Sequence, residues 1–291
     1  MTRRADEFEF CWTPKRRRLW RQCRRKYFYH YYGARGGHEV SAPDFIRTIY
    51  IAKCALPLPA YLRRVIDLAI REIFYAPPDA GLEKLTLSAA AFRIAEREFR
   101  QFFFGSENPK YFCEDWRDGG KPGTLFDEMC SALEKCCAEF ERGAWSRLAD
   151  TAPECRRYLE SPLVLNVGEL KCAIVPLIAL RQAADLWLID GGGTPDDGDE
   201  ISALARFAFF NRCQIPPERV KTFVIPNDDP GAFLQVGQDA DFSTVFAGIK
   251  LDVDDMLGVI RPDGTIDEAD FTCNTSECGD CPFRALCSRE N

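Results

Sequence analysis

Residues 163–190 read LVLNVGELKCAIVPLIALRQAADLWLID, and this stretch decides the fold class. It holds three short runs rich in Val, Ile and Leu, separated by Gly168-Glu169 and by Arg181–Ala184. Short aliphatic runs bounded by turn residues predict β-strands. We therefore expect an antiparallel meander of three strands: Leu163–Val167, Lys171–Ala179 and Asp185–Ile189.

On both sides of the meander the chain is mostly helical, because apolar residues recur every three or four positions. A further strand, Val220–Pro226, follows the meander, and a loop at 105–124 separates two long helices. The expected helices are Phe10–Tyr32, residues 43–75 with a break at Pro57 and Pro59, Leu85–Phe104, Leu125–Leu148, Ile201–Arg212 and Leu251–Leu257.

This order of elements predicts one α+β domain over residues 1–291. Residues 1–160 are its mainly helical part, residues 161–230 hold the meander with its helix and strand, and residues 270–291 form a cysteine-rich tail. The composition is 46% hydrophobic, which supports a buried core and excludes a disordered chain.

The sequence favours a soluble, cytoplasmic protein without a membrane partner. Its longest apolar run, Ala173–Leu180, is shorter than the roughly 20 residues that cross a bilayer. The start, Met1–Phe10, is charged and lacks the apolar stretch of a secretory signal.

The charge is distributed unevenly along the chain. Residues 1–35 contain eleven basic and three acidic residues, a net of +8, while the remaining 27 basic and 42 acidic residues give −15. A basic arm on an acidic body can still bind a polyanion, because phosphate attraction is local. The alternative interpretation is that the arm is a helix whose charged residues are solvated and whose aromatic side chains face the core. The predicted DNA contacts are Arg16, Arg17, Arg18, Arg21, Arg24, Arg25 and Lys26.

The cysteines at the C-terminus have the spacing of a metal site. Cys278 and Cys281 form a CxxC pair, and Cys287 follows after five residues. A CxxC turn brings two thiolates to one metal or cluster, so a fourth ligand has to come from elsewhere. Cys273 would complete a local zinc knuckle, and Cys23 is the distant alternative.

With Cys23 followed by Arg-Arg-Lys-Tyr-Phe-Tyr and with this tail, the chain resembles the RecB-type PD-(D/E)XK nucleases. It is most similar to their iron–sulfur branch, found in the AddAB helicase–nuclease and in CRISPR-adaptation exonucleases. The resemblance implies a restriction-endonuclease-like core, a small mixed sheet with flanking helices. It also implies a 4Fe-4S cluster, with zinc as the alternative, that staples the two ends of the chain through Cys23, Cys278, Cys281 and Cys287.

The same resemblance implies a Mg²⁺ or Mn²⁺ site on the meander, made of one carboxylate on each of two strands and a lysine. Asp190 matches the second carboxylate. The lysine position holds Gly192, and the first carboxylate position falls at Ala179. One carboxylate holds a hard divalent ion poorly.

The other family motifs are also replaced by apolar residues. A metal-binding His, four residues after a Gly, falls at Ile66 after Leu62. The later Gln and Tyr that position DNA fall at Ala203 and Phe207. Nearby acids would supply a migrated carboxylate or form a solvated loop: Asp196, Asp197, Asp199 and Glu200.

Two hypotheses about function follow. The first is an inactive pseudonuclease with a vestigial Asp190, kept as a DNA-binding or structural subunit of a recombination, repair or defence complex. The alternative is an active metal-dependent DNA exonuclease or endonuclease with ligands rearranged around Asp190. A third hypothesis is a zinc-knuckle scaffold that does not touch DNA.

Overall fold

The structure is a computed structural model that describes residues 1–4, 9–76, 85–104, 122–149, 151–157, 162–191, 194–226, 229, 231–279 and 281–287. Its described residues fall into two compact units, and we treat each separately. The terminal unit comprises Met1–Leu58, Arg100–Gly120 and Gly248–Asn291; the sheet unit comprises Pro59–Phe99 and Lys121–Ala247. The single domain over residues 1–291 stays a prediction.

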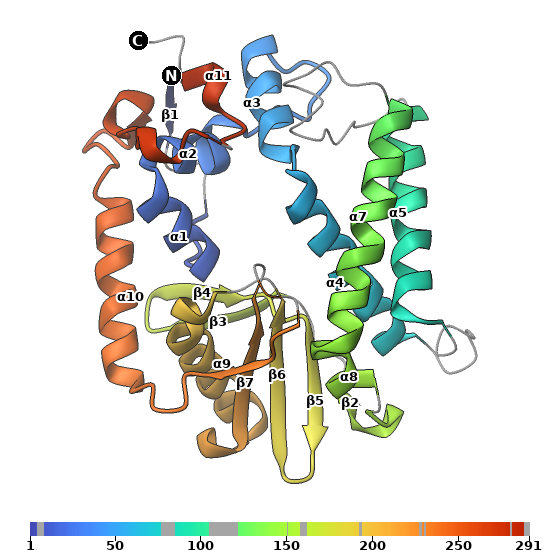
Figure 1. Ribbon diagram of the computed structural model, residues 1–291. Coiled ribbons are helices and arrows are strands. Elements are labelled where there is room, and N and C mark those ends of the chain that lie inside the picture. Colours follow the sequence, from blue (N-terminus) through green and yellow to red (C-terminus); the bar gives the residue numbers. More distant parts are fainter. Residues whose placement is uncertain are drawn as a thin grey trace. The chain divides into compact units, whose positions relative to one another are not determined.

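The sheet unit is built on a mixed sheet of five strands in the order β2-β5-β6-β7-β8 (Figure 1). β5 and β6 form an antiparallel hairpin, and β6 pairs in parallel with β7. A parallel pair needs a crossover, which α9 (Gly198–Cys213) provides. The strands are β2 (Arg156–Arg157), β5 (Ile178–Gln182), β6 (Asp185–Gly191), β7 (Val220–Ile225) and β8 (Leu234–Val236).

The predicted three-strand meander is wrong in its middle strand. β3 (Leu163–Val167) and β4 (Leu170–Ile174) pair only with each other, among the residues described, and form a separate two-stranded sheet. The expected strand Lys171–Ala179 therefore consists of β4, a break and β5. Pro176 lies in the break, where its missing N–H removes a ladder donor.

The helices of the sheet unit follow their apolar periodicity. In α4 (Leu58–Tyr75) the residues Val65, Ile66, Ala69 and Ile70 are buried along one face. On the opposite side of α4, Arg64 bonds to Glu98 of α5 (Leu87–Phe104) through two nitrogens, at 2.7 and 3.0 Å. α4 and α5 match the predicted helices, and α9 matches the predicted helix Ile201–Arg212 with a longer start.

The predicted helix Leu125–Leu148 is divided in two. α7 (Pro122–Arg142) and α8 (Ala144–Ala149) meet at Gly143. A Cβ at Gly143 would lie 2.2 Å from the carbonyl oxygen of Gly231, so only glycine permits this approach of two backbones. Of the predicted loop 105–124, residues 105–121 lie outside the described residues and residues 122–124 belong to α7.

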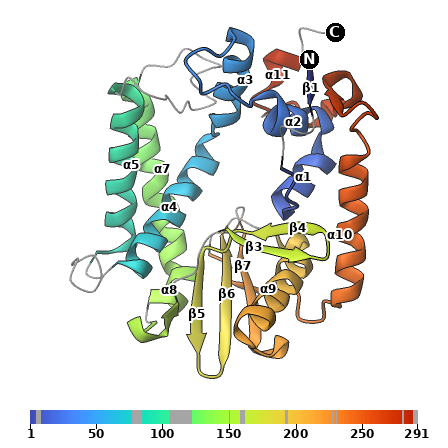
Figure 2. The ribbon, with the colours of Figure 1, turned by 180° about the vertical axis from the view of Figure 1, so that it is seen from behind.

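The terminal unit joins the two ends of the chain. β1 (Thr2–Arg4), next to the N-terminus in Figure 2, pairs with β9 (Thr265–Asp267), with Arg3 opposite Ile266. The helices are α1 (Pro14–Gln22), α2 (Arg24–Phe28), the π-helical turn Tyr29–Gly33, α3 (Asp44–Cys54) and α11 (Arg284–Cys287). α10 (Phe242–Leu257) extends the expected helix Leu251–Leu257 by nine residues at its start. Single 3₁₀ turns of this unit lie at Glu268–Asp270 and Thr275–Glu277. Those of the sheet unit lie at Pro153–Cys155, Pro195–Asp197 and Pro217–Arg219.

The predicted single helix Phe10–Tyr32 is interrupted at Cys23. This residue is extended, with φ −160° and ψ 112°, so it ends α1 and caps α2. Thr13 caps α1 as the sequence indicates, accepting the N–H of Arg16 at 3.0 Å, and Pro14 occupies the first turn.

Aromatic side chains form the core of the terminal unit. The ring of Phe271 contacts those of Trp20, Tyr27, Phe28 and Tyr32, with centroid distances from 5.1 to 6.4 Å. Five aromatic residues of the arm, Trp12, Trp20, Tyr27, Phe28 and Tyr29, are buried, and Phe10 and Tyr31 are partly buried. The buried side chains therefore stabilise the fold. Within the described residues, no helix has both the length and the apolar composition needed to span a bilayer.

Candidate metal centre

Cys23 lies at the junction of α1 and α2, and its side chain is buried. Its Sγ accepts backbone N–H groups from Lys26 and from Asn274, each at 3.4 Å. The second contact comes from a residue 251 positions further along the chain. N–H groups directed at a cysteine sulfur stabilise its thiolate form, the form that binds metals.

The C-terminal cysteines converge on the same place. The N–H of Cys281 donates to the carbonyl of Cys278 at 3.4 Å, which closes the CxxC turn. Cys287 ends α11, and its N–H donates to Phe283 at 3.0 Å. The exposed Cys273 precedes Asn274, whose amide contacts Cys23.

The thiols interact electrostatically with one another. Burial, followed by the nearby Cys23 and Cys278, raises the pKa of Cys273. Burial also raises the pKa of Cys281, and so do Cys23 and Cys278, while Lys26 lowers it. Electrostatic interactions therefore link Cys23, Cys273, Cys278 and Cys281 within the terminal unit.

Cys287 shows the same effect most strongly. Burial, followed by Cys273 and Cys281, raises its pKa to about 12, against a smaller lowering by Arg25. Crowded thiols resist ionising together, and a bound metal reverses this because it stabilises every thiolate that it ligates.

The donor set fits zinc or an iron–sulfur cluster, since thiolates are soft ligands that select these groups over Mg²⁺ or Ca²⁺. Among the described residues, no three Cys, His, Asp or Glu side chains already stand in the geometry of a metal site. Binding would therefore draw the thiols together from a loose cluster. A depression of 280 Å³ adjoins the cluster and is lined by Trp20, Arg21, Gln22, Cys23, Arg24, Asp252, Asp255, Thr272 and Asn274.

Most arginines predicted to contact DNA are engaged within the terminal unit. Arg16 and Arg17 are buried, and Nε of Arg16 donates to the hydroxyl of Tyr27 at 2.8 Å. Three others form ion pairs with carboxylates: Arg21 with Asp252 at 2.9 Å, Arg24 with Asp255 at 3.0 Å and Arg25 with Glu268 at 2.9 Å. These contacts hold the arm against the C-terminal part of the unit.

A second group of basic residues in the terminal unit has a different environment. Partial desolvation, followed by the charges of Arg18, Lys53 and Lys26, lowers the pKa of Lys15. Burial, followed by the charges of Lys53, Lys15 and Lys26, lowers the pKa of His30 to about 3, so His30 is neutral at pH 7. We call Lys15, Lys26 and Lys53 the lysine cluster. Their mutual repulsion marks a place where an anion would be stabilised.

In the sheet unit, Asp190 lies near the end of β6 and is 9% exposed. Ala179 pairs with Leu188 and not with Asp190. Leu177, whose N–H donates to Ile189 at 2.8 Å, is the residue opposite Asp190 when the register is continued. Both positions are apolar, so a shift of register does not restore the first carboxylate.

The residues at the other nuclease motif positions pack against neighbouring side chains, as far as they belong to the described residues. Leu62 and Ile66 are buried in α4, and Ala203 is buried in α9. Phe207 stacks on Phe242 with ring centroids 5.0 Å apart. Gly192, at the lysine position, lies outside the described residues.

The acidic segment after β6 is partly built into the fold. Asp197 is buried and accepts the hydroxyl of Thr194 at 3.1 Å, whereas Asp196 and Asp199 are exposed. The interpretation as a solvated acidic loop therefore fits the exposed Asp196, whereas Asp197 is buried and the exposed Asp199 belongs to the first turn of α9.

Sequence interpretation missed Asp67 on α4. A Cβ at Gly191 would lie 3.0 Å from Oδ1 of Asp67, so this carboxylate closely approaches the strand end beside Asp190. Burial raises the pKa of Asp67, while Arg63, at 2.9 Å, and Arg71 lower it. Successive strand residues face opposite sides, so Asp67, beside Gly191, approaches the sheet from the side opposite the Asp190 side chain. The available signal was the series Arg63, Asp67, Arg71 at intervals of four along a helix.

Comparison with models of protein families, with curated proteins and with solved structures finds no match to this chain.

Proposed function

We propose that this chain is a RecB-like pseudonuclease that carries a 4Fe-4S cluster and serves as a DNA-binding or structural subunit in recombination, repair or defence. The observation that carries the proposal is the gathering of Cys23 with the C-terminal cysteines inside one compact unit. The proposed location is the cytoplasm, where thiols stay reduced and free to bind a metal.

The proposed ligands are Cys23, Cys278, Cys281 and Cys287. Cys23 is buried with two N–H donors on its sulfur, and it is preferred to the exposed Cys273 for that reason. The cluster would supply a covalent cross-link between the two ends of the chain. Arg25 and Lys26 add positive charge beside the thiolates.

Metal analysis of anaerobically purified protein tests this proposal. We expect about four iron and four sulfide per chain, the content of a [4Fe–4S] centre held by four cysteines, with broad visible absorption. Equimolar zinc without iron would favour the zinc-knuckle scaffold instead.

We propose that the nuclease core is inactive. Incubation of the full chain with Mn²⁺ and labelled single- or double-stranded DNA should give no cleavage above a protein-free control. The physical reason is that Ala179, Leu177 and Ile66 supply no oxygen or nitrogen ligand, and catalytic groups that act as a unit do not compensate for one another.

The alternative function is a metal-dependent nuclease with ligands rearranged around Asp190, a carboxylate that is 9% exposed near the end of β6. Cleavage that is abolished by Asp190→Ala would establish this alternative. The exposed Asp199→Asn is the matched control, because it removes one charge in the same segment of the chain.

For DNA binding, we propose that the lysine cluster makes the main phosphate contacts. Replacing Lys15, Lys26 and Lys53 together with Gln should weaken binding and reduce the slope of log K against log salt by about 1 per lost contact. Arg21→Gln with Arg24→Gln is the matched control, since both arginines are neutralised by carboxylates. A greater loss of DNA affinity in this control than in the triple lysine variant would show that the arginines make the main phosphate contacts.

A further inference from the structure

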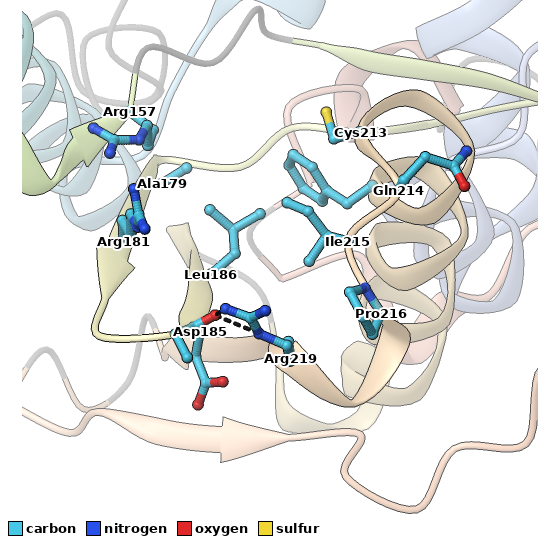
Figure 3. Close-up of a pocket in the computed structure, with 12 residues that line it drawn as sticks. Arg157, Ala179, Arg181, Asp185, Leu186, Cys213, Gln214, Ile215, Pro216 and Arg219 are labelled. Carbon is cyan, nitrogen blue, oxygen red and sulfur yellow. Dashed lines mark hydrogen bonds between the residues drawn. The ribbon is translucent and has the colours of Figure 1, made fainter.

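We infer that the sheet unit contains a binding site for a small organic phosphate, with an apolar or aromatic body, at the end of the sheet remote from Asp190. The site is a cavity of 440 Å³ between the β5–β6 hairpin and the end of α9 (Figure 3). We call it the arginine pocket, after Arg157, Arg181 and Arg219 in its lining. Its size falls within the range of about 300–1,000 Å³ of small-molecule sites.

Strand register directs two of the arginines to the same side of the sheet. Arg157 on β2 pairs with Ala179 on β5, and Arg181 lies two residues after Ala179 on the same strand. Side chains two apart on one strand and directly opposite on the next share a face. Figure 3 shows Arg157, Ala179 and Arg181 together along one wall of the pocket.

The guanidinium groups retain N–H groups for a ligand. Arg157 uses Nη1 for the backbone carbonyls of Glu154 and Arg156, at 2.6 and 2.9 Å, and neither bond neutralises its charge. Arg181 is exposed and forms no ion pair with any carboxylate of the described residues. A planar guanidinium matches a phosphate through paired hydrogen bonds, which favours this anion.

Arg219 has a supporting role. It donates from Nε and Nη2 to the carbonyl of Ala184, which fixes the β5–β6 turn where Ala183 has a φ of 52°. Asp185 is the one acid among the residues that line the pocket, so three positive charges face one negative charge.

The facing wall is apolar. Ile215 and Pro216, which follow the end of α9, stand opposite Arg157 and Arg181 in Figure 3, with Leu186 between the two walls. Leu186 and Phe209 are each 8% exposed and form the floor. A phosphate at Arg157 and Arg181 would leave the body of the same molecule against this wall.

The pocket lies toward the end of β6 that is remote from Asp190, and its wall includes Ala179, which stands at the first carboxylate position of the nuclease motif. Leu186 is the second residue of β6 and Asp190 lies four residues later, which is about 13 Å along a strand. Because Ala179 supplies no metal ligand, phosphate binding in this pocket requires no metal at Asp190, and the inference does not depend on the pseudonuclease proposal.

Calorimetric titration of the full chain with phenyl phosphate tests the inference. We expect saturable binding that weakens with salt, and tighter binding of phenyl phosphate than of inorganic phosphate, phenol or benzoate. Arg181→Gln should weaken it about tenfold, the effect of losing a hydrogen bond to a charged group. Arg97→Gln, an exposed arginine on α5, should leave the affinity unchanged.

A second variant tests the apolar wall. Ile215→Ala should weaken phenyl phosphate and leave inorganic phosphate unchanged, since only the ring contacts Ile215. Several results would overturn the inference: no binding of phenyl phosphate, equal binding by wild type and Arg181→Gln, or inorganic phosphate binding as tightly. Benzoate binding more tightly than phenyl phosphate would overturn the choice of phosphate as the anionic group.

Discussion

Cys23→Ser should abolish the visible absorption and the iron content of the purified protein and should strongly destabilise the terminal unit. Cys23 and Cys278 are 255 positions apart, so a cluster that joins them restricts the unfolded chain as a long-range cross-link does. By analogy with cross-links that close long loops, the expected loss is about 4 kcal/mol in the free energy of unfolding. Iron analysis and urea unfolding followed by circular dichroism measure both effects.

Two matched variants make this experiment selective. Cys213→Ser changes an exposed cysteine of the sheet unit and should retain full colour and stability. Cys273→Ser should also retain the cluster, because we assign Cys273 no ligand role. An intact cluster in Cys23→Ser together with its loss in Cys273→Ser would reveal a site confined to the C-terminal tail.

The second large effect is expected at Glu268, a buried carboxylate that is 2% exposed. It accepts hydrogen bonds from Nη1 of Arg25, at 2.9 Å, and from the hydroxyl of Tyr29, and it lies 3.6 Å from the N-terminal amine of Met1. Glu268→Ala leaves Arg25 and Tyr29 without this partner in a desolvated position. We expect a loss of about 3–5 kcal/mol in the free energy of unfolding, as for other broken buried ion pairs.

Asp270→Ala provides the comparison, since Asp270 forms an exposed ion pair with Arg261 at 2.8 Å. Exposed ion pairs contribute little, so this variant should unfold at nearly the wild-type urea concentration. Glu268→Gln should fall between the two, because the amide keeps a hydrogen-bond acceptor but loses the charge. Equal stability of Glu268→Ala and Asp270→Ala would contradict a stabilising role for the buried pair.

The local pattern of the sequence predicted most helices and strands, but it predicted few of the elements with which they pair or pack. Periodicity was sufficient for α4, α5 and β3, because each buries one regular face. It failed at Cys23, an extended residue between two helices, and at Pro176, where an aliphatic run continues past the end of β4. A Pro inside an aliphatic run was the available signal for the second break.

The candidate site shows a different limit. The cysteine spacing predicts a metal site at Cys278, Cys281 and Cys287, and the assignment of Cys23 as its fourth ligand depends on a family resemblance; both stay predictions. The predicted DNA contacts depended on charge alone. Arg21, Arg24 and Arg25 pair with Asp252, Asp255 and Glu268, and these partners lie 231 to 243 positions away in the chain. A pattern among neighbouring residues does not predict ion pairs between residues so far apart in the sequence.

The pairing of β1 with β9 has a consequence for the order in which the protein forms during synthesis. Residues 1–58 leave the ribosome before the sheet unit, yet Phe271 and the strand Thr265–Asp267 that complete their packing are translated after it. The sheet unit, enclosed between Pro59 and Ala247 in the sequence, has all of its strands available earlier. Because nascent chains fold as their contacts become available, Trp20, Tyr27 and Phe28 would stay exposed until residues 265–271 are synthesised. Residues 1–58 thus complete their packing only after the sheet unit, and a chaperone would bind them during that interval.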